Sequence, residues 1–444
     1  MRKKIDAQHS SISRRDFFKT TSMATGGLLL SSLPVGASAY VAPGETLRVA
    51  LIGCGGRGTG AANNALQTGN GVKLVAMADA FEDRVEESYN HLMNRYEGTG
   101  KIDVPDDHKF AGLDAYKHAI ELADVALLCA PPAFRPIHFE EAVQQGKHVF
   151  AEKPVATDIP GIRKFFNASE TAREKNLNVV VGLQRHYSTK YRELVKRIND
   201  GAIGQIISGQ VYWNTSSMTG YITERQPDQT EMEYQIRNWY WFHWLGGDHV
   251  LEQHIHNYDI ASWFIGEHPS SAQGMGGREV RTGKEYGNIF DHHFVEFTYP
   301  SGAIIASQSR QQDNTMSLVA ENLQGTRGTV EADPGRIRHY NDYLVYEHDD
   351  EDDPNPYQKE IDELFSSIRN GEVIDDTEHG GHSTLSGIMG RMATYSGQII
   401  TREEAINSDL SLMPDRFDLD AEPPILPDEE GYYPIAKPGE TRVL

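Results

Sequence analysis

The sequence predicts an α/β protein with two domains, a doubly wound parallel sheet followed by a second α/β domain. Three observations predict this fold class. An apolar strand pattern runs directly into a glycine-rich turn, strand and helix patterns then alternate to about residue 156, and β-rich segments follow residue 200. A chain of 444 residues is long enough for two domains that each bury their own core.

Composition limits the partners of this chain. The formal net charge is −22, whereas nucleic acids and anionic membrane surfaces select for clustered Lys and Arg. No apolar run reaches the roughly 20 residues of a spanning helix, and the two cysteines form no disulfide framework. We therefore expect no nucleic-acid partner and no membrane span.

The first 39 residues have the pattern of an export signal. Paired arginines in Ser13–Lys19, "SRRDFFK", precede a weakly apolar stretch that ends in the small residues Ala37-Ser38-Ala39. This order is typical of a twin-arginine signal peptide; the alternative is an ordinary secretory peptide with an incidental arginine pair. We expect residues 1–39 to be removed and the mature protein to reside in the periplasm.

The glycine-rich turn predicts a dinucleotide site. After the strand pattern 47–52, Gly53, Gly55 and Gly58 take the Gly-x-Gly-x-x-Gly spacing. The first glycine allows a tight turn, the second lets the backbone approach a pyrophosphate, and the third lets the helix pack on the strand. Gly56 and Arg57 lie inside the same turn, where helix N-terminal amides face the phosphates.

A carboxylate beyond this turn specifies the dinucleotide. The next strand pattern, "VKLVAMADA", ends at Asp79, about 20 residues past the last glycine, where the fingerprint places a ribose-binding acid. A 2′-phosphate would meet a negative charge there. The expected cofactor is therefore NAD, with NADP less favoured.

The alternation continues beyond Asp79. A helix is expected at 83–95, a strand in "ADVALLCAPP", a helix at 137–145 and a strand in "GKHVFAEKPVATD". Pro131 follows a strand at its carboxyl end, where doubly wound sheets bind ligands. We assign residues 45–156 to this domain.

At Glu152-Lys153-Pro154 the chain resembles the Gfo/Idh/MocA oxidoreductases. The glycine turn, Asp79 and the Pro131-Pro132 loop carry the resemblance, which extends past Gly325 to a helix near 382–399. It implies a Rossmann domain followed by an α/β domain with a large open, mainly antiparallel sheet. It also implies that Glu152 and Lys153 contact the cofactor, with Lys153 between nicotinamide and substrate. Members commonly pair through the open sheet, which implies a dimer or tetramer.

The second domain, residues 157–400, also has α/β patterns of its own. Strands are expected in "QIISGQVYW", "HHFVEFTYPSGAIIASQSR" and "GTRGTVEA", with "YPSG" as a hairpin turn. The helix near 382–399 is placed against the Rossmann domain, and residues 401–444 form a tail.

The stretch "HVLEQHIHNYD" predicts a helix with a polar face. His249, Glu252, His256 and Asp259 recur at spacings of three and four. The family pattern here is Asp-x-Gly-x-His-x-x-Asp, so that Glu252 replaces an aspartate and His254 a glycine. The face is compatible with a catalytic site, with a zinc site made by His249, Glu252 and His256, or with hydrogen bonds at a subunit interface.

We favour the catalytic interpretation, without a metal. His256 acts as general base or acid on a substrate hydroxyl, Glu252 orients it or binds a neighbouring hydroxyl, and Lys153 stabilises charge on the carbonyl oxygen. The pattern assigns no role to His249 or His254.

Polar and aromatic residues elsewhere indicate a carbohydrate substrate. Arg185 and His186 follow a strand, Arg237 lies in "QIRNWYWFHW", and Asp259 completes the predicted substrate-binding set. Aromatic rings mixed with Arg, Asn and His suit a sugar ring, and the two arginines suit an anionic group such as a uronate.

Three functions follow from these predictions. The first is an NAD-dependent oxidoreductase acting on a hydroxyl of a sugar, polyol or glycoside, with tightly bound NAD. The second is an NAD-using enzyme that cleaves glycosides through oxidation, elimination, hydration and reduction. The third is a sugar-binding protein without catalysis, against which the presence of Lys153 and His256 argues.

Overall fold

The computed structural model of this chain describes residues 45–69 and 71–444. The predicted signal peptide, residues 1–39, lies outside them. Within the described part, no helix is both long and apolar enough to cross a bilayer.

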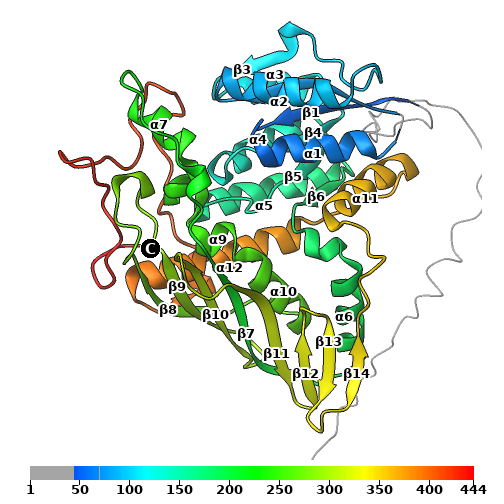
Figure 1. The fold of residues 1–444 in the computed structure, drawn as a ribbon, viewed down its shortest axis with the longest axis vertical. Helices are drawn as coiled ribbons and strands as arrows, with labels where there is room; N and C mark the ends of the chain where they lie inside the picture. The colour runs from blue at the N-terminus through cyan, green and yellow to red at the C-terminus, as the bar shows by residue number, and fades with distance from the viewer. Residues whose placement is uncertain (1–44, 70) are drawn as a thin grey trace, which may run out of the picture. The chain divides into compact units, whose positions relative to one another are not determined.

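The N-terminal domain is built on a six-stranded parallel sheet in the order β3-β2-β1-β4-β5-β6. Its strands are β1 Leu47–Ile52, β2 Val72–Asp79, β3 Lys109–Ala111, β4 Val125–Leu128, β5 His148–Ala151 and β6 Val179–Val181. The helices between them are α1 Gly56–Gln67, α2 Glu82–Arg95, α3 Ala115–Glu121, α4 Arg135–Gln144 and α5 Ile159–Glu174 (Figure 1). The predicted doubly wound sheet is confirmed.

The predicted domain boundary at residue 156 is wrong. Helix α5 and strand β6 continue the same parallel sheet, since β6 pairs with β5, so the domain extends to about residue 183. A three-residue strand such as Val179–Val181 gives almost no periodic signal. Helix α11 (Pro356–Asn370) also returns from the far end of the chain and packs on α1.

The second domain contains a nine-stranded sheet in the order β14-β13-β12-β11-β7-β10-β9-β8-β15. Its strands are β7 Ile206–Thr215, β8 Ser271–Gly277, β9 His292–Thr298, β10 Ile304–Gln311, β11 Leu318–Gly325, β12 Gly328–Glu331, β13 Arg336–His339, β14 Leu344–Glu347 and β15 Ile400–Thr401. Only β7 and β10 pair in parallel. The mainly antiparallel sheet and the hairpin turn between β9 and β10 are therefore confirmed.

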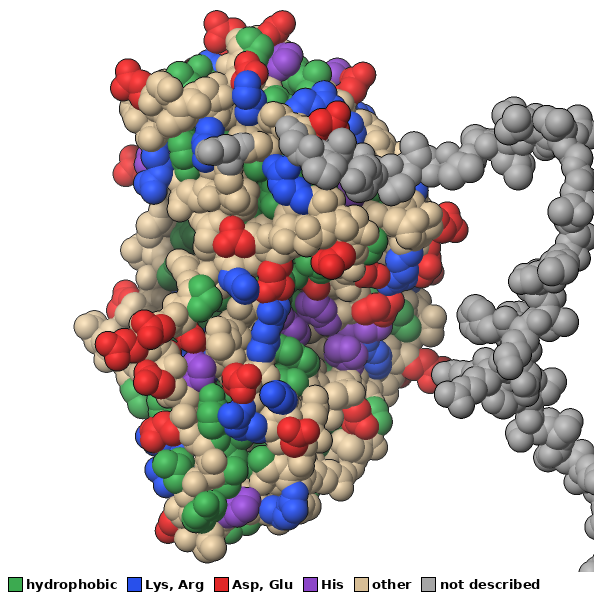
Figure 2. Space-filling view, turned by 90° about the vertical axis from the view of Figure 1, so that its right-hand side faces the viewer, with side chains coloured by type: hydrophobic (Ala, Val, Ile, Leu, Met, Phe, Trp, Pro, Cys, Tyr) green, Lys and Arg blue, Asp and Glu red, His purple; other side chains and the backbone are tan. Residues whose placement is uncertain are grey.

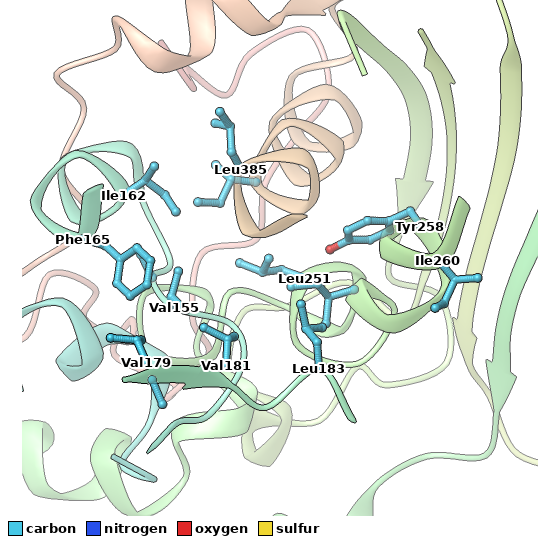
Figure 3. Packing of buried hydrophobic residues seen from close by; sticks show 14 of the residues in the cluster. Val155, Ile162, Phe165, Val179, Val181, Leu183, Leu251, Tyr258, Ile260 and Leu385 are labelled. Carbon is cyan, nitrogen blue, oxygen red and sulfur yellow. The ribbon is translucent and has the colours of Figure 1, made fainter. Parts of the chain in front are cut away.

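Helices cover one face of this sheet and join it to the first domain. Helix α12 (Thr377–Ser396) contacts α5 and β6 on one side and β8 and β9 on the other (Figure 1). Figure 3 shows this junction, where Leu251 and Leu385 meet Val155 and Val181 in one buried cluster. A continuous apolar core thus fixes the strand ends of one domain against the helices of the other.

Short elements complete the fold. They are α6 Thr189–Asn199, α7 Glu231–Arg237, α8 His243–Gly246, α9 His249–Glu252, α10 Ile255–Ile265, α13 Arg402–Ile406 and the 3₁₀ turns η2 Asp106–His108, η3 Pro132–Phe134, η4 Gln184–Tyr187, η5 Thr219–Tyr221, η6 Trp239–Trp241 and η7 Lys284–Tyr286. Residues 216–242, here the cover segment, contain η5, α7 and η6. Residues 408–433, here the belt, form the main part of the predicted C-terminal tail.

Candidate active site

A cavity of about 430 Å³ lies between the carboxyl ends of the parallel strands and the cover segment. The glycine turn, the end of β2, the Pro131-Pro132 loop and Lys153 form one side of it. The cover segment forms the other side. Its residues there are Gly220, Tyr221, Thr223, Ile236, Arg237 and Trp239. This is where a doubly wound sheet is expected to bind its ligand.

The glycine turn fits a dinucleotide. Gly53 has φ +94°, and a Cβ there would lie 2.3 Å from the Ala130 nitrogen. A Cβ on Gly58 would lie 1.9 Å from the Gly53 oxygen, so both positions need glycine to close the turn. Nothing lies within 4 Å of a Cβ on Gly55 or Gly56, both of which line the cavity. The open space beside these two glycines and the first amides of α1 is suited to a pyrophosphate.

Asp79 ends β2 at the rim of the cavity, as predicted for a ribose-binding acid. Its two carboxylate oxygens also accept hydrogen bonds from the backbone nitrogens of Cys54, at 2.7 Å, and Phe81, at 3.1 Å. Burial raises the pKa of Asp79, and these two amides oppose that rise. The residue therefore organises the glycine turn in addition to facing the cofactor space.

Arg57 connects the glycine turn to two carboxylates. Its Nε donates to Glu152 at 2.5 Å and its Nη2 donates to Glu360 at 3.0 Å. Glu360 is fully buried on α11, and burial raises its pKa well above the usual value. No local sequence pattern predicts the role of Glu360, because it lies 303 positions from Arg57 in the chain.

Lys153 meets Glu252 at the inner end of the cavity. The Lys153 ammonium donates to the Glu252 carboxylate at 2.8 Å and to the Glu252 carbonyl oxygen at 2.6 Å. Both residues line the cavity. The structure thus brings together two of the three predicted catalytic residues, one from each domain.

The third, His256, lies buried behind them, 6% exposed, and does not line the cavity itself. Its Nδ1 has no hydrogen-bond partner among the described residues, and its ring lies 5.9 Å from that of Trp213. Burial, followed by the charges of Lys153 and Arg185, holds the pKa of His256 well below the usual value. The imidazole is therefore neutral at physiological pH.

The predicted single helix with one polar face is wrong. The helix is interrupted between α9 and α10. There the backbone N–H of His254 donates a hydrogen bond to the carbonyl oxygen of His249, five residues earlier, at 3.1 Å. His249 turns toward the sheet and bonds to Ser309 at 2.5 Å, while His254 bonds to Ser307 at 2.7 Å. These two imidazoles are core groups that tie the helices to β10, because buried polar groups need hydrogen-bond partners.

The predicted substrate-binding residues Arg185, His186 and Asp259 are already paired. Arg185 forms an ion pair with Glu321, which is buried on β11. His186 bonds to Asp259 at 2.8 Å, and Asp259 also accepts from Ser383 at 2.7 Å. None of the three lines the cavity.

His186 belongs to a stack of aromatic rings. Its ring lies 4.1 Å from Trp263 and 4.2 Å from His379. Histidines gather at the surface on the side of the molecule that carries α6 and α11 (Figure 2). This stack is a feature that the residue spacing did not predict.

Arg237 lines the cavity, but at its cofactor end. The guanidinium makes two hydrogen bonds to the Asp83 carboxylate, at 3.0 and 3.1 Å, and lies 3.8 Å above the Phe81 ring. Phe81 and Asp83 lie shortly after Asp79, the predicted ribose-binding acid, in the sequence. This location suits a contact with the cofactor better than one with the substrate.

The zinc ligands considered from the sequence do not come together. In the part of the chain that the structure describes, one group of three has converging ligand atoms, Asp248, His249 and His293, and it excludes Glu252 and His256. The Asp248 carboxylate already accepts from the amides of His249 and Phe290 and from the Tyr395 hydroxyl. Asp248 is therefore a buried hydrogen-bond acceptor that connects these segments in the core.

Comparison with known proteins gives two family matches. Residues 47–183 match the model of an oxidoreductase family with an NAD-binding Rossmann fold. Residues 191–331 match the GFO/IDH/MocA C-terminal domain.

Similar proteins include two curated relatives. Inositol 2-dehydrogenase 3 of Saccharopolyspora erythraea is 27% identical over 59% of this chain, and the match spans 65% of that protein, just under two thirds. Inositol 2-dehydrogenase of Rhizobium meliloti is 25% identical over 66% of this chain and 77% of its own length. Among solved structures, aldose-aldose oxidoreductase from Caulobacter crescentus, in complex with glycerol, has a TM-score of 0.62 at 18% identity, covering 80% of this chain and all of that one.

The glycine turn yields a prediction with a matched control. Gly58→Ala forces a methyl group against the Gly53 carbonyl. We therefore expect the free energy of unfolding to fall by about 1–3 kcal/mol, the usual effect of overpacking. Gly55→Ala meets no protein atom but fills cofactor space. We expect it to leave the melting temperature unchanged and to weaken NADH binding about tenfold, or ~1.4 kcal/mol. Calorimetry and NADH titration measure both; equal melting temperatures for the two variants would contradict this account of the turn.

Proposed function

Because this chain belongs to the GFO/IDH/MocA family of oxidoreductases and contains its NAD-binding Rossmann domain, we propose that it oxidises a hydroxyl group of an uncharged sugar or polyol. The observation that carries the proposal is the Lys153–Glu252 pair at the inner end of the cofactor cavity, with the neutral imidazole of His256 behind it.

The residues divide the chemistry between them. Bound NAD would accept a hydride from the carbon that carries the hydroxyl. His256, whose unpartnered Nδ1 is buried outside the cavity lining, takes the hydroxyl proton through one intervening water molecule. The Lys153 ammonium stabilises the negative charge that develops on the oxygen, and Glu252 holds that ammonium from both its carboxylate and its carbonyl oxygen.

Charge pairing supports an uncharged substrate. Arg185 is neutralised by Glu321, and Arg237 by Asp83 and Glu233. Since a carboxylate on the substrate would have to displace one of these partners, the two arginines give no support to the uronate suggested by the sequence alone. The relatives named inositol 2-dehydrogenase support a polyol.

Replacing either proposed catalytic residue should strongly lower the turnover rate and leave NAD binding intact. We expect Lys153→Met and His256→Gln each to lower kcat by about 10²–10⁴-fold, the usual effect of removing one acid–base group. NADH affinity should change little for His256→Gln, since His256 does not line the cavity. A sugar and polyol screen with NADH absorbance measures turnover, and exhaustive chelation should not alter it.

The pH profile separates this role from a structural one. The base form of His256 is its neutral form, and its pKa lies well below 6.5. As pH falls through 6.5, kcat/KM should therefore be maintained, and the acid limb should appear at lower pH. A limb near 6.5, or a His256→Gln enzyme with a near-normal rate, would refute the assignment.

We also propose that the protein is exported to the periplasm by the twin-arginine route. The support is the sequence of residues 13–39, which suits a protein exported with its cofactor already bound. Replacing Arg14 and Arg15 together by lysine should leave the protein in the cytoplasmic fraction. Unchanged periplasmic yield from that variant would refute the route.

A homo-oligomer is our third proposal, formed through the open face of the nine-stranded sheet. Met275, 70% exposed, is paired with Phe294, and Ile304, 43% exposed, lies on the same face, paired with Thr298. Exposed apolar patches mark interaction surfaces. We expect Met275→Lys with Ile304→Glu to reduce the sedimentation coefficient to that of a monomer. Val373→Glu, on the α11–α12 connection and 50% exposed, is the control and should not. A wild-type monomer would disprove the proposal.

A further inference from the structure

The cover segment forms one wall of the cofactor cavity, and Arg237 binds it to the Rossmann domain. Arg237, at the end of α7, makes two hydrogen bonds to Asp83 and stacks on Phe81, both at the start of α2. Arg237 and Phe81 line the cavity, whereas Asp83 does not. The contact therefore closes the side of the cavity next to Asp79, where the ribose of the cofactor is expected.

The belt holds α7 in this position. The Thr230 hydroxyl donates to the Leu419 carbonyl at 2.6 Å, the Gln235 amide donates to the Ile425 carbonyl at 2.6 Å, and the Tyr433 hydroxyl donates to Glu231 at 2.6 Å. Gln235 is fully buried. Figure 1 shows the C-terminal chain, in red, running beside α7.

The other end of the belt is fixed to the Rossmann domain. Asp158, the N-cap of α5, accepts from the amide of Leu412 at 2.8 Å, and the Phe417 ring lies 5.4 Å from that of Phe134. Phe134 itself lines the cavity. The cover segment is thus tied to the Rossmann domain twice, directly by Arg237 and indirectly through the belt.

We propose that Arg237, Asp83 and Phe81 form a latch that retains NAD(H), and that this latch must open before the dinucleotide leaves. The latch rests on the NAD-binding domain and is independent of the substrate. Asp83 is a positioning residue, since it acts on the cofactor only by holding Arg237. Because Asp83 is 62% exposed at its side chain, the ion pair is accessible to salt, which weakens exposed pairs.

The test measures NADH release without substrate. The full-length protein is loaded with NADH and mixed with excess NAD⁺, and the loss of bound NADH fluorescence gives the dissociation rate. We expect Arg237→Ala to accelerate release roughly five- to tenfold, as for losing one exposed ion pair and one cation–π contact. Asp83→Ala should accelerate it about threefold. The double variant should release NADH no faster than Arg237→Ala, because the two residues act as one unit.

Two controls separate the latch from general loosening. Lys109 pairs with Glu86 on α2 and lies 3.9 Å over the Tyr89 ring, an equivalent contact within the Rossmann domain alone, so Lys109→Met should leave release unchanged. Raising ionic strength should accelerate release from the wild type and have no effect on Asp83→Ala.

The following outcomes would each contradict the proposed latch. Acceleration by Arg237→Ala but not by Asp83→Ala would mean that Arg237 contacts the cofactor alone, without a latch. Unchanged release in both variants, or additive effects in the double variant, would also refute it. Failure of every sugar and polyol as substrate would refute the proposed function and leave these release rates interpretable.

Discussion

The pair between Lys153 and Glu252 is the interaction on which the candidate site depends. It joins the end of a parallel strand to a short helix that lies 99 residues later in the chain. Both side chains are mostly buried, 13% and 15% exposed, so removing one leaves a charge with little water to solvate it. The second bond, to the Glu252 carbonyl, is available because α9 ends at Glu252, and the last carbonyls of a helix lack intrahelical partners. The break between α9 and α10 therefore contributes directly to the position of the ammonium.

What the sequence predicts well is local. The turn from Gly53 to Gly58, the acid at Asp79 and the strand that precedes Lys153 all depend on neighbours within about thirty residues, and each lies where it was predicted. Strand alternation explains one miss. The segment "QIISGQVYW" supplies two aromatic rings of the kind expected to suit a sugar, Tyr212 and Trp213. Successive side chains of a strand point to opposite faces, and of these two it is Trp213 whose ring lies beside His256.

The other misses involve partners from distant segments. A polar face at helical spacing predicts a continuous helix, but hydrogen bonds from His249 and His254 to two serines on β10 favour a break. In the same way, Arg185 and Arg237 look available in the sequence, because Glu321 and Asp83 are 136 and 154 positions away from them. Composition and spacing detect a charged side chain; they do not detect whether another element has already neutralised it.

Retention of the cofactor would change which reactions are possible. In the proposed periplasmic location, a dinucleotide held by the proposed latch has no free nicotinamide pool to exchange with, so it has to be reoxidised where it is bound. Either a second carbonyl compound enters the same site and takes the hydride, or the first substrate takes it back after an elimination and a hydration, as in the glycoside-cleaving alternative. Both routes use Lys153 and His256 twice, once as the hydroxyl loses its proton and once as the carbonyl regains one. The proton that His256 takes as the hydroxyl is oxidised is the one that it returns as the carbonyl is reduced, and the ammonium fixed by Glu252 stabilises the oxygen in both steps. The two routes differ in their products: the first converts two substrates without loss of a group, whereas the second releases an aglycone. Both return the bound nucleotide to its starting redox state.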